Sequence, residues 1–148
     1  MLEIIRAKPV DRSILREIAI ESKGYWGYKT FLMEEFAKAP IITRESIEHD
    51  PVFKAMRDGA TAGWYRVFPH VPVAEIEDLW VLPAEIGTGI GRALFQHACK
   101  IAREAGCSAA AWDADPNAVG FYEKMGAVVI GQSWSEWQRY LPRLRIEL

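Results

Sequence analysis

The segment from Val73 to Asp113 restricts the possible folds more than any other part of this sequence. Val73 to Leu82 shows the alternation of a strand, Gly89 to Ala105 repeats apolar residues at helical spacing, and Ser108 to Asp113 is a short apolar strand. A strand, a long helix and a strand in this order predict two parallel strands with a right-handed crossover. Ligands of such sheets usually bind at the carboxyl ends of the parallel strands, which here means the turn after Leu82.

The remaining segments extend this unit into a larger sheet. Further strands are predicted at residues 2–7, 52–57, 62–68, 127–134 and 138–148. Further helices are predicted after a cap at Asp11, around residues 31–36, after a cap at Thr43, and from Asp115 to Met125. Since no repeat or linker divides the chain, we expect a single domain over residues 1–148. Its fold class is α/β, with a central mixed sheet flanked by helices.

Composition and charge exclude several classes of function. The chain has 148 residues, of which 50% are hydrophobic, and a net charge of −2 without a cluster of Lys and Arg, so we expect no nucleic-acid partner. No apolar stretch approaches the roughly 20 residues that span a bilayer, and the charged first residues do not fit a signal peptide. We therefore expect a cytoplasmic protein with no membrane partner. The cysteines and histidines lack the spacing of metal ligands, so no metal site is expected.

Three glycines alternate with other residues between the strand that ends at Leu82 and the following helix. Gly87, Gly89 and Gly91 allow close approach to the backbone, and the helix start offers unpaired N–H groups with a partial positive charge. A phosphate or pyrophosphate fits there, with Arg92 as an added cation. The segment lacks the Gly-Lys-Ser/Thr of a Walker loop and the third small residue of a dinucleotide fingerprint.

Two motifs make the assignment more specific. The run from Leu79 to Leu94, LWVLPAEIGTGIGRAL, resembles the cofactor-binding motif of the GNAT superfamily of acyl-CoA-dependent N-acyltransferases. The run from Asp115 to Ala127, DPNAVGFYEKMGA, is similar to the next motif of the same family. One departure is Ile86, which stands where the family usually has Gln or Arg. Backbone amides provide most of this binding in the family, so the change concerns one side-chain contact.

The resemblance implies acetyl-CoA as cofactor and a sheet that splays to admit it. The pyrophosphate would lie over the glycine turn. The pantetheine arm would pair like an extra strand with the backbone of Leu79 and Val81. The cofactor-binding residues implied are Leu79, Trp80, Val81, Ile86, Gly87, Thr88, Gly89, Ile90, Gly91, Arg92 and Asn117.

The chemistry of amine acetylation identifies the candidate catalytic residues. An alkyl amine with a pKa of about 10 is protonated at neutral pH and must lose a proton before it can attack a thioester. Glu75 or Glu77, which share a strand face with the expected cofactor residues, is the candidate base, directly or through a water. Tyr122 matches the general acid of the family, which protonates the departing thiolate. The adjacent Phe121 is expected to be the apolar anchor of that helix.

The acceptor pocket and the partners rest on the resemblance alone. In the family the early helices and late strands surround the acceptor, which here implicates Tyr25, Trp26, Tyr28, Trp134 and Trp137. We expect an N-acetyltransferase acting on a primary amine of a small molecule or peptide, with a homodimer as the common default for such domains. Two alternatives are a non-catalytic acyl-CoA-binding or regulatory module and, less favoured, a different nucleotide binder.

Overall fold

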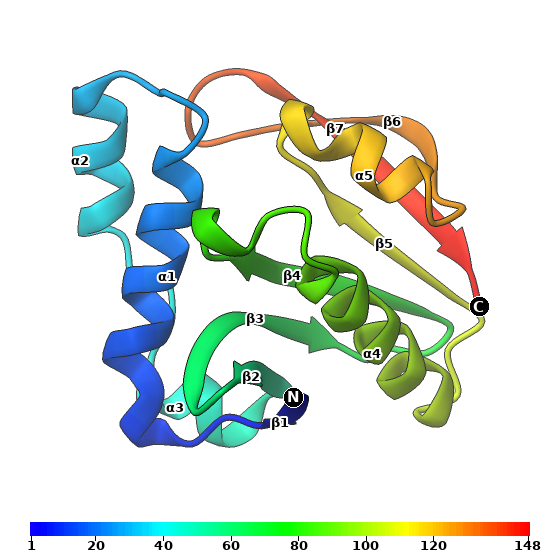
Figure 1. Ribbon diagram of the computed structural model, residues 1–148. Coiled ribbons are helices and arrows are strands. Elements are labelled where there is room, and N and C mark those ends of the chain that lie inside the picture. Colours follow the sequence, from blue (N-terminus) through cyan, green and yellow to red (C-terminus); the bar gives the residue numbers. More distant parts are fainter. The chain divides into compact units, whose positions relative to one another are not determined.

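The computed structural model describes all residues from 1 to 148 (Figure 1). Its strands are β1 (Leu2–Arg6), β2 (Val52–Arg57), β3 (Ala60–Phe68), β4 (Val73–Val81), β5 (Ala109–Asp113), β6 (Val128–Trp134) and β7 (Tyr140–Glu147). Its α-helices are α1 (Arg12–Gly24), α2 (Thr30–Lys38), α3 (Arg44–His49), α4 (Ile90–Glu104) and α5 (Val119–Glu123). Three 3-10 turns are η1 (Pro9–Asp11), η2 (Pro83–Glu85) and η3 (Pro116–Ala118). The predicted elements are all present, with small shifts at their ends.

The strands form one mixed sheet of seven strands in the order β1-β2-β3-β4-β5-β7-β6. β4 and β5 are parallel, whereas β1–β2, β2–β3, β5–β7 and β6–β7 are antiparallel pairs. The predicted α/β class and the parallel strand-helix-strand unit are therefore confirmed. The register of β4 with β5 runs from Val73 opposite Ala109 to Glu75 opposite Ala111 and ends there, although β4 continues to Val81.

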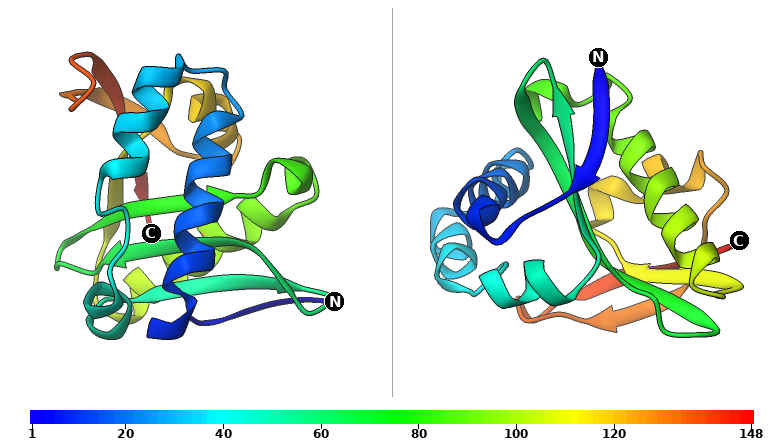
Figure 2. Two further views of the ribbon diagram at one scale, coloured as in Figure 1. Left: turned by 90° about the vertical axis from the view of Figure 1, so that its left-hand side faces the viewer. Right: turned by 90° about the horizontal axis from the view of Figure 1, so that it is seen from below.

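The chain divides into two compact units, residues 1–66 with 78–97 and residues 67–77 with 98–148. In the first unit, α1 and α2 lie side by side (Figures 1 and 2). Leu15, Ile18 and Ala19 form the buried stripe of α1, at the spacing that places side chains on one helix face. The indole N–H of Trp64 on β3 donates a 2.7 Å hydrogen bond to the main-chain carbonyl of Leu15. This bond fixes α1 against the core of the unit.

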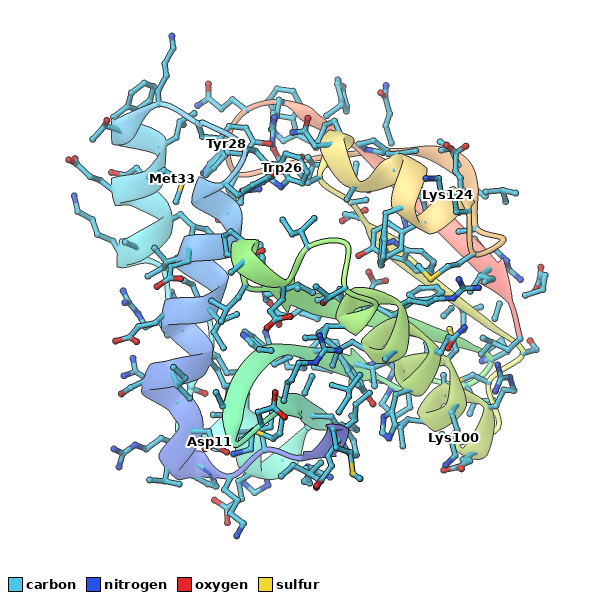
Figure 3. The ribbon with its side chains drawn as sticks, viewed as in Figure 1. Asp11, Trp26, Tyr28, Met33, Lys100 and Lys124 are labelled. Carbon is cyan, nitrogen blue, oxygen red and sulfur yellow. The ribbon has the colours of Figure 1, made fainter.

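Two predicted helix caps of the first unit have different outcomes. Thr43 precedes α3 and accepts a 3.1 Å hydrogen bond from the Ser46 amide, as expected of a capping residue. Asp11 occupies the predicted position before α1, near the start of that helix in Figure 3, but its side chain makes no capping bond. Its carboxylate accepts instead from the Lys8 amide at 2.8 Å and from Lys54 Nζ at 3.0 Å. Asp11 therefore closes the preceding 3-10 turn.

In the second unit, β5 is buried on both faces. Ala109, Ala110 and Ala111 are successive buried residues, and successive residues of a strand point to opposite faces. β6 differs, because it is the last strand of the order and most of its residues are exposed, including Val128 and Ile130. No helix of the structure combines the length and the apolar composition that a bilayer crossing requires.

Candidate functional site

β4 separates its side chains into two faces as the alternation predicted. Ala74, Ile76 and Asp78 are buried, whereas Glu75 is half-buried and Glu77 is exposed. The two candidate bases therefore share a face, opposite to the buried one. Toward the end of the strand the burial changes, because Leu79, Trp80 and Val81 are all half-buried.

The glycine turn after β4 is open backbone. Gly87 and Gly89 have φ values of 84° and 93°, in the left-handed region that favours glycine. A Cβ atom at either position would meet nothing within 4 Å. The turn therefore uses glycine for its backbone conformation and leaves free space beside it. The α4 helix begins directly afterwards at Ile90, whose side chain is fully buried and anchors the first helical turn.

Side chains of the turn itself point away from the core. Ile86, at the position where a polar residue was expected, is 47% exposed, and Thr88 and Arg92 are also exposed. Thr88 Oγ1 lies 2.6 Å from the main-chain oxygen of Glu85 and 3.0 Å from its Oε2. Arg57 at the end of β2 donates from Nη1 to the same Oε2 at 3.2 Å. The Glu85 carboxylate is thus held by Thr88 from within the turn and by Arg57 from β2.

Gly63 on β3 explains how the end of β4 is positioned. A Cβ atom at Gly63 would lie 2.7 Å from the main-chain oxygen of Trp80 and 3.0 Å from Leu94 Cδ1. Such a distance to a backbone atom excludes a side chain, so only glycine allows this close approach. The part of β4 that carries Leu79, Trp80 and Val81 is therefore packed directly against the β3 backbone.

Asp78 is a residue that the sequence analysis missed. Its carboxylate is buried on β4, where Oδ2 accepts a 2.8 Å hydrogen bond from Arg66 Nε and Oδ1 accepts a 3.1 Å bond from the Trp80 indole. Desolvation by burial raises the pKa of Asp78, and the neighbouring Arg66 cation partly offsets this effect. The sequence contained one signal for this site, namely an acidic residue at a strand position whose side chain points inward. Its partner on β3 could not be identified from spacing.

In the second unit, Glu75 belongs to a charged cluster that sequence reasoning also missed. Arg143 on β7 donates to both carboxylate oxygens of Glu75, at 2.6 and 3.0 Å, and to Asp113 Oδ1 at 3.1 Å. These hydrogen bonds to Glu75 are the main reason that the pKa of Arg143 is raised. Glu75 is thus held in one orientation by a bidentate ion pair.

Tyr122 lies on α5 and is buried, whereas its neighbour Phe121 is 37% exposed. The expectation that Phe121 is the apolar anchor is wrong, because Tyr122 is the aromatic ring that packs inside. Its ring centroid is 5.0 Å from that of Trp112 on β5. Burial raises the pKa of Tyr122 above its ordinary value, which extends the pH range over which its hydroxyl is protonated.

Asn117 lies in the 3-10 turn that precedes α5. Its backbone N–H and its side-chain amide both donate to Asp115 Oδ1, each at 2.9 Å. Asp115 therefore caps this turn, as its position before a proline predicted. The expected helix accordingly begins as a 3-10 turn and becomes α-helical only at Val119.

The predicted acceptor aromatics take part in four separate contacts. Tyr25 and Trp26 pack edge to face with centroids 4.9 Å apart, and Tyr28 has Lys23 Nζ 5.0 Å from its ring centroid. Figure 3 shows Trp26 and Tyr28 in the segment after α1. Within the second unit, Trp134 contacts Tyr140 at 5.0 Å, and Trp137 lies under the Arg139 guanidinium at 5.4 Å.

Comparisons with known proteins identify a matching family and similar structures. The family model described as the acetyltransferase (GNAT) family matches residues 15–127. Glucosamine 6-phosphate N-acetyltransferase of Trypanosoma brucei brucei is 41% identical over 54 residues, which are 36% of this chain and 37% of that relative. The chain thus matches well under two thirds of that relative's length.

Two solved structures share the fold over nearly the whole chain. One is the PaiA N-acetyltransferase from Thermoplasma acidophilum in complex with coenzyme A, with a TM-score of 0.85, 20% identity, and coverage of 100% of this chain and 99% of that one. The other is a GCN5-related N-acetyltransferase from Rhodopseudomonas palustris, with a TM-score of 0.85, 20% identity, and coverage of 99% and 95%.

Proposed function

Because the chain belongs to the acetyltransferase (GNAT) family, we propose that it is an acyltransferase that uses acetyl-CoA as its cosubstrate and acetylates a primary amine by direct transfer. The observation that carries the proposal is the open turn at Gly87 and Gly89, where left-handed backbone and free space precede a helix start. Main-chain N–H groups in this position bind phosphate oxygens without help from side chains.

The pantetheine arm is proposed to run along the second half of β4. Two observations support this position: the register of β4 with β5 ends at Glu75, and the strand continues to Val81. An extended ligand can form strand-like hydrogen bonds with Leu79 and Val81, as peptides do at sheet edges. The N–H of Val81 is then suited to polarise the thioester carbonyl. Asn117 is proposed to support the cofactor from the start of α5.

We propose Glu75 as the base, acting on the acceptor ammonium through an ordered water. Its bidentate contact with Arg143 holds the carboxylate in one orientation, and a carboxylate has further lone pairs with which to accept from water. Preorganisation of this kind favours proton transfer. The exposed Glu77 is the alternative base on the same strand face. Tyr122 is proposed as the acid, since its hydroxyl is protonated and can donate to the leaving thiolate.

The acceptor is proposed to be a small-molecule amine, with a peptide amine as the second class. The curated relative carries the name of an enzyme for an amino-sugar phosphate, which supports a small acceptor. The exposed pair Tyr25 and Trp26 is suited to cover such a molecule, and the lysine over Tyr28 indicates that this ring attracts cations. Trp134 and Trp137 are proposed as the contribution of the late strands. The cytoplasmic location and the homodimer stay predictions from the sequence.

The decisive experiment measures thiol release from acetyl-CoA with a panel of amines. The panel contains glucosamine 6-phosphate, glucosamine, simple alkyl amines and short peptides with a free amino terminus. We expect release well above background hydrolysis with at least one amine and a product that is heavier by one acetyl group in mass spectrometry. Binding of coenzyme A without acetylation of any of the four classes of amine would contradict the proposal.

A further inference from the structure

A carboxylate lies in the glycine turn, where the proposal for the cofactor places a diphosphate. Glu85 is the only acidic residue between Pro83 and Arg92. Thr88, between the two left-handed glycines, contacts Glu85 Oε2 at 3.0 Å and its main-chain oxygen at 2.6 Å. The charge is therefore anchored inside the turn. A second anion beside it would be repelled unless a cation compensates.

Arg57 provides that cation from another strand. It is the last residue of β2, and its Nη1 lies 3.2 Å from Glu85 Oε2, the oxygen that Thr88 also contacts. Both side chains are partly shielded, with 30% of Arg57 and 25% of Glu85 exposed. Within residues 83–92 the charges of Glu85 and Arg92 cancel. The additional cation from Arg57 therefore makes the net charge around the turn positive.

We propose that Arg57 is a positioning residue of the cofactor site, which acts through Glu85. It neutralises this carboxylate and, with Thr88, holds it in the turn, so that the backbone N–H groups can receive the diphosphate of acetyl-CoA. The inference rests on the proposed position of the cofactor on the turn. It differs from a direct contact between Arg57 and the cofactor, because the effect of Arg57 then depends on the presence of Glu85.

A double-mutant cycle tests this dependence. The affinity for coenzyme A is measured by titration calorimetry for wild type, R57Q, E85Q and R57Q/E85Q. We expect R57Q to weaken binding about three- to tenfold, because the unpaired Glu85 carboxylate would then repel the partly screened diphosphate. E85Q keeps an oxygen acceptor for Thr88 and is expected to bind as tightly as wild type or tighter. The double variant is expected to return to within about twofold of wild type.

The controls separate charge, folding and direct contact. Lys100, labelled in Figure 3, forms an exposed ion pair with Glu104 at 3.9 Å. K100Q removes this lysine and is expected to bind coenzyme A as tightly as wild type. Thermal unfolding without ligand shows whether each variant folds. Titration with 3′-dephospho-coenzyme A is expected to reproduce the R57Q defect, because the effect concerns the diphosphate.

Three results would overturn the inference. Unchanged binding by folded R57Q would remove any role of Arg57 in the site. A double variant as weak as R57Q would mean that Arg57 contacts the cofactor itself. Loss of the R57Q defect with the dephosphorylated ligand would place Arg57 at the 3′-phosphate. If wild type failed to bind coenzyme A, the position of the cofactor would fail instead, which distinguishes the two proposals.

Discussion

Arg143 on β7 holds both carboxylate oxygens of Glu75 on β4, with Nη2 2.6 Å from Oε1 and Nη1 3.0 Å from Oε2. The same guanidinium also reaches Asp113, the last residue of β5. One arginine thus ties together residues of three strands of the second unit. The proposed base is therefore fixed by its surroundings before any substrate arrives.

This arrangement predicts different effects for the two candidate bases. E75Q should lower kcat about 100-fold with little change in KM for acetyl-CoA, because a general base acts on the amine and not on cofactor binding. E77Q is the matched control and should retain most of the activity. The measurement is steady-state thiol release with the best amine of the panel. A large loss in E77Q together with an active E75Q would assign the base to Glu77.

Replacing Tyr122 by Phe tests the general acid. Y122F should lower kcat by about 100-fold and leave the affinity for coenzyme A unchanged, since the acid acts only when the thiolate leaves. F121L alters the neighbouring exposed ring and serves as the control. Titration with coenzyme A measures binding separately from turnover. Full activity of Y122F would assign the proton donor to another group.

The buried hydroxyl of Tyr122 also predicts how stability changes at alkaline pH. Its pKa is raised in the folded chain, so the unfolded chain loses this proton first as the pH rises. The contribution of Tyr122 is therefore complete below about pH 10, its ordinary pKa, and is lost as the pH rises further. Urea unfolding above that pH should show a steeper loss of stability for wild type than for Y122F. Parallel curves would contradict the burial of the hydroxyl.

Gly63 predicts a stability effect that needs no functional assay. In G63A the new methyl group would meet the Trp80 carbonyl oxygen at 2.7 Å, and we expect a loss of about 2 kcal/mol in the free energy of unfolding. G131A on β6 is the control, because a Cβ atom there meets nothing within 4 Å. Chemical denaturation of both variants measures the difference. Equal stabilities would show that β3 and β4 can move apart at little cost.

Asp78 provides a further test of the first unit. D78A removes the buried acceptor of Arg66 Nε and of the Trp80 indole. Arg66 is half-buried and keeps its ion pair with Asp50 at 3.8 Å, so we expect a loss of about 2 kcal/mol in the free energy of unfolding. E104Q breaks the exposed pair with Lys100 and should change stability by less than about 0.5 kcal/mol. Urea unfolding with the two-state slope compared between variants measures both effects.

Local patterns in the sequence predicted much of the fold. The alternation of β4 correctly placed Glu75 and Glu77 on one face. The glycine turn was predictable because three alternating glycines cost backbone entropy without a local structural gain, which favours a close approach of a ligand. The parallel pairing of β4 with β5 followed from the order strand, helix, strand along the chain. These features depend on neighbours in the chain, so their signals are visible in the sequence.

Contacts between distant segments could not be predicted in this way. Asp78 meets Arg66, Glu85 meets Arg57 and Glu75 meets Arg143, and each pair joins different elements. Register between strands decides which charges face each other, and one sequence does not contain that information. The burial of Tyr122 in place of Phe121 has the same origin. One residue of phase on a short helix decides which ring faces inward.

The run of alanines in β5 has a practical consequence for protein engineering. Because neither face of this strand offers room for a larger group, most larger residues at positions 109–111 would destabilise the fold. Libraries aimed at new acceptors would do better to keep this strand constant and to randomise the solvent-facing rings at Tyr25, Trp26 and Trp134.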